Sequence, residues 1–288
     1  MKLVTFAQHG ETHIGALVAR GGQAAIFDFN RAQPGLPADM TEFLKAGEPA
    51  RTLAQSALAA ADERCFVPAA EATLLAPVPR PGKIICLGHN YRDHAGGELP
   101  EHPTFFAKTS NVVVGSHQPI VYPRMSIQMD YEAELMVVIG KRVRYAVEEH
   151  ALESVAGYTI FNDITARDVR KLSSQWTLAK SFDTFGPMGP ALVTADEIPE
   201  PGNLDVSLSL NGREMQRSNT SAFIFSIPFV IAYLSQALTL EPGDVIATGT
   251  PGGTGASRQP PVFMQPGDEV RVTIEKLGEL VNRVVAET

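Results

Sequence analysis

The sequence predicts an α+β fold in which strands predominate, with a small N-terminal α/β domain over residues 1–75 and a larger domain over residues 76–288. In the larger part, the expected strands are not separated by helices at regular intervals, which argues against a doubly wound parallel sheet. The segment 76–82, APVPRPG, contains three prolines and a glycine and predicts a stiff, extended connection. A chain of 288 residues is long enough to bury a sizeable core.

Short strands followed by two helices are expected in the first 75 residues. The pairs His9-Gly10 and Gly21-Gly22 stand where turns would join the strands, and the second helix is rich in alanine. The expected strands cover residues 3–6, 14–18 and 24–29, and the expected helices cover residues 40–45 and 50–61.

The larger part is rich in short β-type segments and has two expected helices. One helix covers 147–155 and begins with a charged turn, and the other covers 228–236, preceded by Ser226 as a capping residue. The expected strands cover residues 83–87, 104–108, 119–121, 132–139, 158–163, 191–193, 204–210, 245–248, 269–274 and 278–285.

The composition excludes several classes of partner. A formal net charge of −8 would repel phosphate backbones and anionic membrane surfaces, so neither nucleic acid nor a membrane is expected. Cys65 and Cys86 form no zinc motif and are expected to be reduced thiols. Residues 1–10 contain no apolar signal core, and the longest apolar stretch, 222–240, is interrupted by polar residues and a proline. A cytoplasmic location is therefore predicted.

The strongest chemical signal is the segment 130–140, DYEAELMVVIG. Successive side chains on a strand point to opposite faces, so Glu132 and Glu134 point the same way, about 7 Å apart. Two neighbouring carboxylates repel one another unless a cation or a proton lies between them. A solvated polar strand face explains this segment equally well when it is taken alone.

A third carboxylate, Asp163, ends an apolar strand within GYTIFNDITARD (157–168). A carboxylate on a buried strand needs a partner. Asp163 either caps the following turn and pairs with Arg167, or completes a set of hard oxygen ligands with the two glutamates. Such a set suits Mg²⁺, Mn²⁺ or Ca²⁺ and leaves positions for water and substrate.

A loop with two histidines, GHNYRDH (88–94), follows an apolar strand. A loop at a strand end is a usual place for a general base, and histidine titrates in the useful pH range. His94 is the best candidate because Glu98, four residues further on, would orient it. A surface histidine without a role is the alternative.

Two further loops offer groups that would bind a substrate carboxylate. Lys180 follows Gln175 in a segment punctuated by glycine and proline, and is either an anion clamp or an ordinary surface lysine. Thr250 lies in ATGTPGGTG (247–255), which is either a rigid loop that binds a carboxylate or a simple connection between strands. This loop lacks the GK[ST] ending of a phosphate loop and the context of a dinucleotide site, so nucleotide binding is rejected.

Taken together, these segments resemble the fumarylacetoacetate hydrolase (FAH) family. In order and spacing the match covers roughly residues 80–286, and the first 75 residues resemble the small N-terminal domain of bacterial members. The segment 175–193 is most similar to a branch that includes bacterial 2,4-dioxo acid hydrolases. The matching segments are GHNYRDH (88–94), DYEAELMVVIG (130–140), GYTIFNDITARD (157–168), KSFDTFGP (180–187), SNTSAFIFSI (218–227) and PGDVIATGTPGG (242–253).

The resemblance implies an FAH-type mixed β-sandwich roll that is usually a homodimer and acts on a small 2-oxo acid. It also implies that Arg167 lies beside the metal and that His94 activates water. The implied cofactor is Mg²⁺ or Mn²⁺, with Ca²⁺ as a substitute introduced by crystallisation. Its implied ligands are Glu132, Glu134 and Asp163. The implied substrate contacts are Lys180, Thr250, Gln175 and Tyr91.

The reaction implied first is hydrolysis of a C–C bond in a 2,4-dioxo acid of the acylpyruvate type, through an enolate that the metal stabilises. Oxaloacetate decarboxylation and keto–enol tautomerisation pass through the same enolate and form the alternative, and a non-catalytic homologue that binds metal and 2-oxo acid is a third. Hydrolytic members usually have a glutamate three residues after the histidine, where this chain has Gly97. Glu98 would have to replace it, in a helical turn that each glycine disfavours by roughly 1 kcal/mol.

Overall fold

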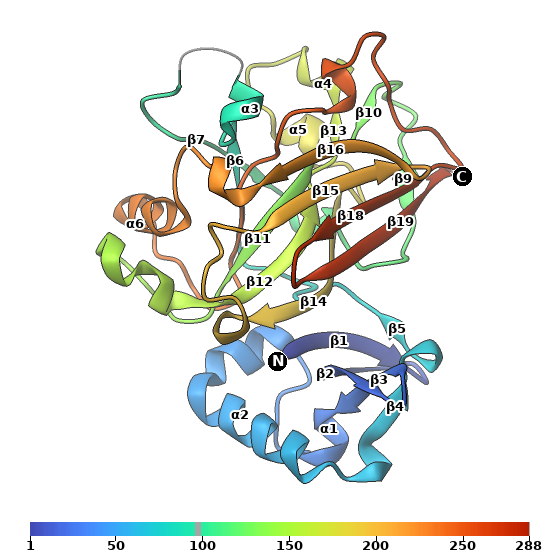
Figure 1. Ribbon diagram of the computed structural model, residues 1–288, viewed down its shortest axis with the longest axis vertical. Coiled ribbons are helices and arrows are strands. Elements are labelled where there is room, and N and C mark those ends of the chain that lie inside the picture. The colour runs from blue at the N-terminus through green and yellow to red at the C-terminus, as the bar shows by residue number, and fades with distance from the viewer. Residues whose placement is uncertain (96–98, 288) are drawn as a thin grey trace.

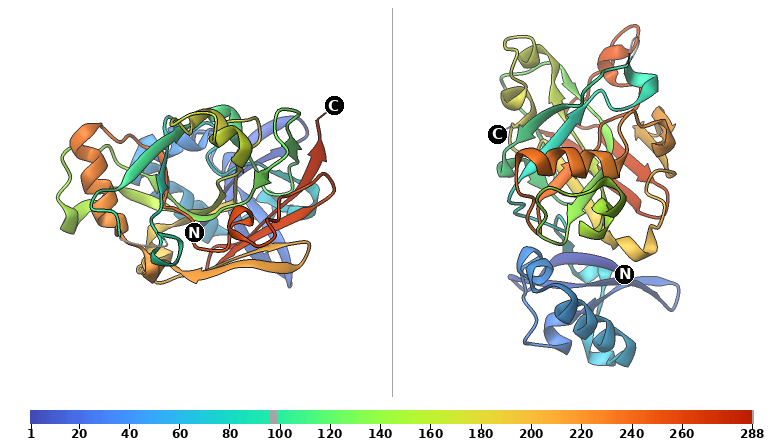
Figure 2. Two further views of the ribbon diagram at one scale, coloured as in Figure 1. Left: turned by 90° about the horizontal axis from the view of Figure 1, so that it is seen from above. Right: turned by 90° about the vertical axis from the view of Figure 1, so that its left-hand side faces the viewer.

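The computed structural model describes residues 1–95 and 99–287. Strands predominate, and the few helices lie at the edges of two large sheets, which confirms the α+β class (Figure 1). The N-terminal segment forms a lower lobe and the rest of the chain an upper one (Figures 1 and 2). None of the helices in the described part of the chain has both the length and the apolar character needed to cross a bilayer.

The N-terminal lobe begins with a meander of three strands whose turns are those expected from the sequence. His9, Gly10, Gly21 and Gly22 all have positive φ angles, as tight hairpin turns require. The elements of this lobe are β1 (Lys2–Gln8), β2 (Glu11–Arg20), β3 (Gln23–Asp28), α1 (Phe29–Ala32), α2 (Met40–Ala60), β4 (Phe66–Pro68) and β5 (Thr73–Leu74).

The two helices expected in this lobe are the two arms of α2. Gly47, with φ 66° and ψ −143°, interrupts the helical backbone, and Pro49 lies just after the break. Asp39 caps the first arm by accepting a hydrogen bond from the backbone N–H of Glu42. The kink therefore falls between the two predicted helices.

The large sheet extends through both lobes. Its strand order is β4-β3-β2-β1-β14-β12-β11-β17-β6-β7, and β1 joins β14 through the antiparallel register of Leu3 with Leu192. The buried core is likewise continuous from the helix α2 to the strands of the upper lobe. The strands of the upper lobe in this sheet are β6 (Ile84–Gly88), β7 (Thr104–Lys108), β8 (Val113–Val114), β11 (Ala133–Ile139), β12 (Val155–Asn162), β14 (Gly186–Thr194) and β17 (Val245–Ala247).

A second sheet of five strands packs against the large one, with β18 against β12 and β19 against both β12 and β14. A short ribbon of two strands, β10 (Met129–Asp130) and β13 (Thr165–Ala166), extends from the ends of β11 and β12. Two packed sheets and few helices agree with the expected sandwich. The strands of the second sheet are β9 (Ile120–Tyr122), β15 (Asp205–Leu210), β16 (Arg213–Asn219), β18 (Glu269–Ile274) and β19 (Gly278–Ala286).

One predicted helix is wrong in type. Residues 147–155 were expected to form an α-helix, but Glu148–Ser154 form the 3₁₀ helix η4, which packs beside α6 (Ile227–Ala237) on one flank (Figure 2). The predicted capping of α6 is confirmed, because the Ser226 hydroxyl accepts a hydrogen bond from the backbone N–H of Phe229 at 3.2 Å. The short helices near the site are α3 (Arg92–Ala95), α4 (Arg167–Arg170) and α5 (Thr177–Lys180).

Candidate active site

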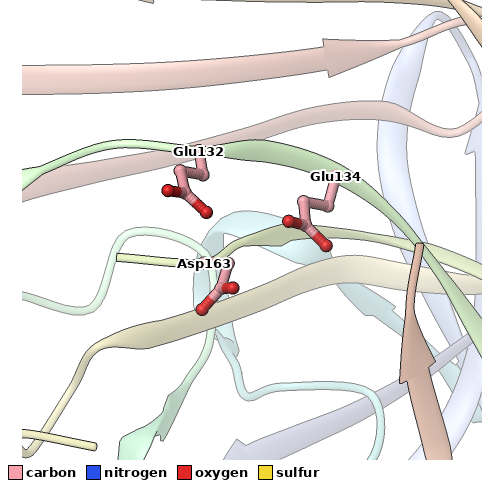
Figure 3. A group of neighbouring side chains, drawn as sticks. All are labelled: Glu132, Glu134 and Asp163. Atoms are coloured by element: carbon pink, nitrogen blue, oxygen red, sulfur yellow. The ribbon is translucent and has the colours of Figure 1, made fainter. Parts of the chain in front are cut away.

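Three carboxylates converge at the ends of two neighbouring strands. Because Ala133 of β11 pairs with Asn162 of β12, Glu132 before β11 lies opposite Asp163 after β12. Glu134 follows on the same side as Glu132, and one oxygen of each carboxylate lies within 4.8 Å of the others. Figure 3 shows the three side chains pointing toward one another. The exposed fractions of Glu132, Glu134 and Asp163 are 6%, 1% and 0%, so this acidic triad is buried.

Three cationic side chains accompany the triad. The Nζ atom of Lys180 donates to Glu132 Oε2 and Asp163 Oδ2, both at 2.7 Å. Lys108 Nζ donates to Asp163 Oδ1, and Arg167 Nη2 donates to Glu132 Oε1, both at 2.5 Å. Burial alone would raise the pKa of Glu132, but the charges of Lys180 and Arg167 lower it well below its ordinary range. Glu132 is therefore ionised.

Among the described residues, Glu134 is the carboxylate of the triad that forms no ion pair. Its Oε2 accepts a hydrogen bond from the backbone N–H of Gly249 at 2.9 Å, whereas its buried Oε1 has no partner among the described residues. Burial, followed by the charges of Asp163 and Glu132, raises the pKa of Glu134 well above its ordinary value. A cation among the three carboxylates would supply the missing partner and remove this repulsion. The residues present thus fit a hard divalent cation.

Arg167 is held in place by a fourth buried carboxylate. Asp130 accepts from Arg167 Nε at 2.7 Å and from the backbone N–H groups of Gly255 and Ala256 at 2.7 and 3.0 Å. A Cβ atom on Gly255 would lie 1.9 Å from the carbonyl oxygen of Val262 and 2.7 Å from Asp130 Oδ1. Asp130 therefore fixes both the arginine beside the triad and the end of the glycine-rich loop.

Thr250, from the same loop, lines the pocket above the triad together with Lys180. Gln216 of β16 positions it, because Gln216 Nε2 donates to Thr250 Oγ1 at 2.9 Å while its Oε1 accepts from the backbone N–H of Ala133 at 2.9 Å. The predicted neighbourhood of Thr250, Lys180, Arg167 and the triad is therefore present in the structure.

Two imidazoles line the same pocket. His94 and His89 stack with their ring centroids 5.6 Å apart and an interplanar angle of 15°. Asn90 anchors their loop, since its side chain is buried and binds the backbone of Phe225 and of Thr248. Burial lowers the pKa of both imidazoles below the ordinary histidine value. Near neutral pH both rings are uncharged, and either has the protonation state of a base.

Three of the predicted site residues do not line this pocket in the described structure. Tyr91 is fully buried and packs edge-on against Phe223 with ring centroids 4.8 Å apart, so its side chain serves the core. Gln175 is exposed to solvent, and only the next residue, Trp176, reaches the pocket. Glu98 lies outside the described residues.

Several polar residues of the site were missed by the sequence reasoning. Asp130 could have been found, because it precedes Glu132 and Glu134 at the same two-residue spacing. Lys108 ends a predicted strand, but nothing in the sequence pairs it with Asp163. His89 and Arg170 were missed because other histidines and arginines close to them in the sequence are equally good candidates for the site.

A comparison with known protein families shows to which family the chain belongs. Residues 83–285 match the family described as fumarylacetoacetate (FAA) hydrolase, C-terminal. The chain belongs to the fumarylacetoacetate hydrolase family. The match covers the whole acidic triad together with Arg167, Lys180 and Thr250.

Relatives in this family align along nearly the whole chain. The mitochondrial oxaloacetate tautomerase Fahd2a of Rattus norvegicus is 44% identical over 291 residues, which are 99% of this chain and 92% of the rat protein. The human mitochondrial oxaloacetate tautomerase FAHD2A is 43% identical over 292 residues, with the same two coverages of 99% and 92%. The expected cytoplasmic location is contradicted, because these FAH-family relatives are mitochondrial proteins.

Solved FAH-family structures have the same fold. The fumarylacetoacetate hydrolase of Exiguobacterium antarcticum is 34% identical with a TM-score of 0.85, and both chains are fully covered. The maleylpyruvate hydrolase of Sphingobium sp. SYK-6, in complex with manganese(II) and pyruvate, is 31% identical with a TM-score of 0.82, again with full coverage of both chains. This chain is therefore an FAH-family enzyme with a candidate metal site.

Proposed function

We propose that this enzyme interconverts the keto and enol forms of a small 2-oxo acid of the oxaloacetate type. The rat and human relatives, 44% and 43% identical over 99% of the chain, are named oxaloacetate tautomerases, which supports this choice within the family. The observation that carries the proposal is one pocket that is lined both by Glu132 and Glu134 of the acidic triad and by two uncharged imidazoles. Proton transfer between carbon and oxygen needs no other group than a base beside a polarised 2-oxo group.

Glu132, Glu134 and Asp163 would hold the divalent cation, Mg²⁺ or Mn²⁺. When bound, the cation polarises the 2-oxo group and stabilises negative charge on its oxygen. Lys180, the buried ammonium group beside Glu132 and Asp163, offsets part of the charge of the triad. Thr250 is held by Gln216 and provides a hydroxyl group for the substrate carboxylate.

His94 is the proposed base. Its neutral imidazole takes a proton from C3 of the keto acid, the C2–C3 double bond forms, and the proton is returned to the oxygen on C2. The reverse direction moves the same proton from oxygen to carbon, so no water or further reactant is consumed. His89, stacked on His94, keeps a second uncharged ring against the base.

Hydrolysis of an acylpyruvate-type C–C bond is the second candidate function. It is favoured by the similarity to maleylpyruvate hydrolase at 31% identity and a TM-score of 0.82. In that reaction His94 would take a proton from the attacking water instead of from carbon. Decarboxylation of oxaloacetate forms a third outcome of the same assay.

The assay follows oxaloacetate and acetylpyruvate by ultraviolet absorbance with Mg²⁺ or Mn²⁺ present, and measures pyruvate separately. Enol–keto equilibration faster than the spontaneous rate, without pyruvate formation, is the expected result. His94→Gln should lower it by roughly 10²–10⁴-fold, the usual contribution of a general base. His150→Gln is the matched control, because His150 is exposed and, within the described part of the chain, pairs with Glu153 alone. Cleavage of acetylpyruvate with oxaloacetate equilibrating at its spontaneous rate would overturn the tautomerase assignment in favour of the hydrolase.

A further inference from the structure

Two arginines of the short helix α4 differ in how they are neutralised. Arg167 donates to both Asp130 and Glu132, so its charge is balanced by two carboxylates of the protein itself. Arg170, one turn further on, also lines the pocket, but within residues 1–95 and 99–287 it pairs with no carboxylate. The described pocket therefore contains one guanidinium group that is available to an anion.

The side chain of Arg170 is supported by an aromatic wall. Its guanidinium carbon lies 4.3 Å from the ring centroid of Trp176. The tryptophan in turn meets His89 edge-on with ring centroids 5.9 Å apart and an interplanar angle of 78°. A Cβ atom on Gly88 would lie 2.7 Å from the Trp176 ring, so a glycine is needed there for the ring to fit. Arg170, Trp176, His89 and His94 together form one wall of the pocket, called here the arginine wall.

The electrostatics of the arginine wall favour an anionic ligand. Burial, followed by the charge of Arg167, lowers the pKa of Arg170. A partly buried cation that lies near a second cation is stabilised when an anion binds to it. A guanidinium group matches a carboxylate in particular, because its planar fork donates two parallel hydrogen bonds.

We propose that Arg170, held against Trp176, is a specificity-determining residue that binds the second carboxylate of a 2-oxo dicarboxylic acid. The 2-oxo end of that ligand would lie at the acidic triad, and this assignment of the two ends rests on the proposed function. The distal carboxylate would lie at the arginine wall, beside the imidazoles that face the carbon between the two ends. Monocarboxylic 2-oxo acids would lack this contact.

Binding of non-reacting ligands tests the proposal without turnover. Malate and lactate are 2-hydroxy acids that differ by the distal carboxylate group, and each is titrated into the Mg²⁺-loaded full-length protein. Trp176 is the only tryptophan of the chain and touches Arg170, so its fluorescence reports binding at the arginine wall. Calorimetry gives the two affinities independently.

Malate should bind the wild-type protein more tightly than lactate by roughly 10- to 100-fold, the range expected for a hydrogen bond between charged groups. Arg170→Gln should abolish this preference, and Arg170→Lys, which keeps the charge without the fork, should restore part of it. The matched control is Lys171→Gln, which removes a neighbouring exposed cation and should keep the full preference. A preference that persists in Arg170→Gln, an equal loss for both ligands, or no saturable malate binding would each overturn the proposal.

Kinetics separate this inference from the proposed function. Oxaloacetate and its 4-methyl ester are compared as substrates, because the ester lacks the distal charge. Arg170→Gln should lower kcat/KM for oxaloacetate and leave that for the ester within about twofold. If neither substrate is turned over while the malate preference still depends on Arg170, the proposed role of Arg170 is supported and the tautomerase assignment is wrong. If both substrates are turned over at rates that Arg170→Gln leaves unchanged, the tautomerase assignment is supported and the proposed role of Arg170 is wrong.

Discussion

At the scale of single residues, the site combines strongly paired charges with two uncharged imidazoles. Lys108 and Lys180 are both buried and both bind Asp163, so that carboxylate is held from two sides. His89 and His94 lie in the same pocket and have lowered pKa values because they are buried. Fixed charges thus surround the triad, while the groups that would move protons remain neutral.

The pH dependence of the reaction should follow His94. A base acts in its neutral form, and burial lowers the pKa of His94 from 6.5, so kcat/KM should fall only as the pH drops through a value below 6.5. The charge of His89 also lowers the pKa of His94, so His89→Gln should move this acidic limb to higher pH. The check is kcat/KM for enol–keto interconversion from about pH 5 to pH 8. An acidic limb above the ordinary histidine value in the wild-type protein would count against His94 as the base.

The side-chain positions that can be predicted from the sequence are those whose direction follows from local geometry. Glu132 and Glu134 share a strand face because side chains alternate, and Asp163 ends the next strand. Tyr91 lies in a loop, where the direction of a side chain depends on packing partners far along the chain, here Phe223. Lys108 could not be assigned for the same reason, since Asp163 is 55 residues away from it in sequence.

At the scale of elements, the antiparallel register of β11 and β12 brings the triad together. Gln216 of β16 links β11 to the glycine-rich loop, because it binds both the backbone of Ala133 and Thr250. Asp130 of β10 binds the backbone of Gly255 and Ala256 at the end of the same loop. The loop therefore belongs to the rigid part of the site, and its backbone leaves no space for a side chain at position 255.

Gly255→Ala should damage this connection. The added Cβ atom would clash with the carbonyl oxygen of Val262 and with Asp130, so the loop or the carboxylate must shift. Overpacking of this kind costs about 1–3 kcal/mol of unfolding free energy, and Arg167 should lose its fixed position. Urea unfolding and metal affinity are the two measurements. Gly202→Ala is the control, because no heavy atom lies within 4 Å of its added Cβ; equal stability of the two variants would contradict the structure of the loop.

The elements themselves were predictable to different degrees. Strands such as β7, β18 and β19 follow alternating or apolar segments bounded by turn residues, and the expected bounds agree within a residue. The 3₁₀ helix η4 was expected to be an α-helix, because short helices of both kinds share the same charged and apolar spacing. Strand β16 was not predicted, since most of its residues are polar and its position depends on pairing with β15.

At the scale of the whole molecule, the large sheet joins the two lobes. Pairing of β1 with β14 continues the sheet from the upper lobe into the N-terminal lobe, and Leu3 and Leu192 are both buried at this junction. The sequence indicated a connection at 76–82 but not this pairing, because the register of two distant strands is set by tertiary packing. The division into two domains at residue 75 remains a prediction.

Deletion of residues 1–75 tests that division. Removing β1 would leave β14 as an open edge with apolar side chains exposed, and such edges pair with other chains. The fragment 76–288 is therefore expected to aggregate, as measured by size-exclusion chromatography and light scattering. A soluble fragment that keeps its metal affinity would show instead that residues 76–288 form an independent domain.

The central claim is that Glu132, Glu134 and Asp163 hold one divalent cation, and calorimetric titration with Mn²⁺ tests it most directly. The wild-type protein and the control variant Glu153→Gln, which alters an exposed glutamate, should each bind one ion per chain. Glu134→Gln should lose more than the roughly 10- to 100-fold in affinity that removal of an outer-shell partner costs, with unchanged metal-free unfolding. Equal affinity of Glu134→Gln and the wild-type protein, or no saturable binding to the wild-type protein, would contradict the account.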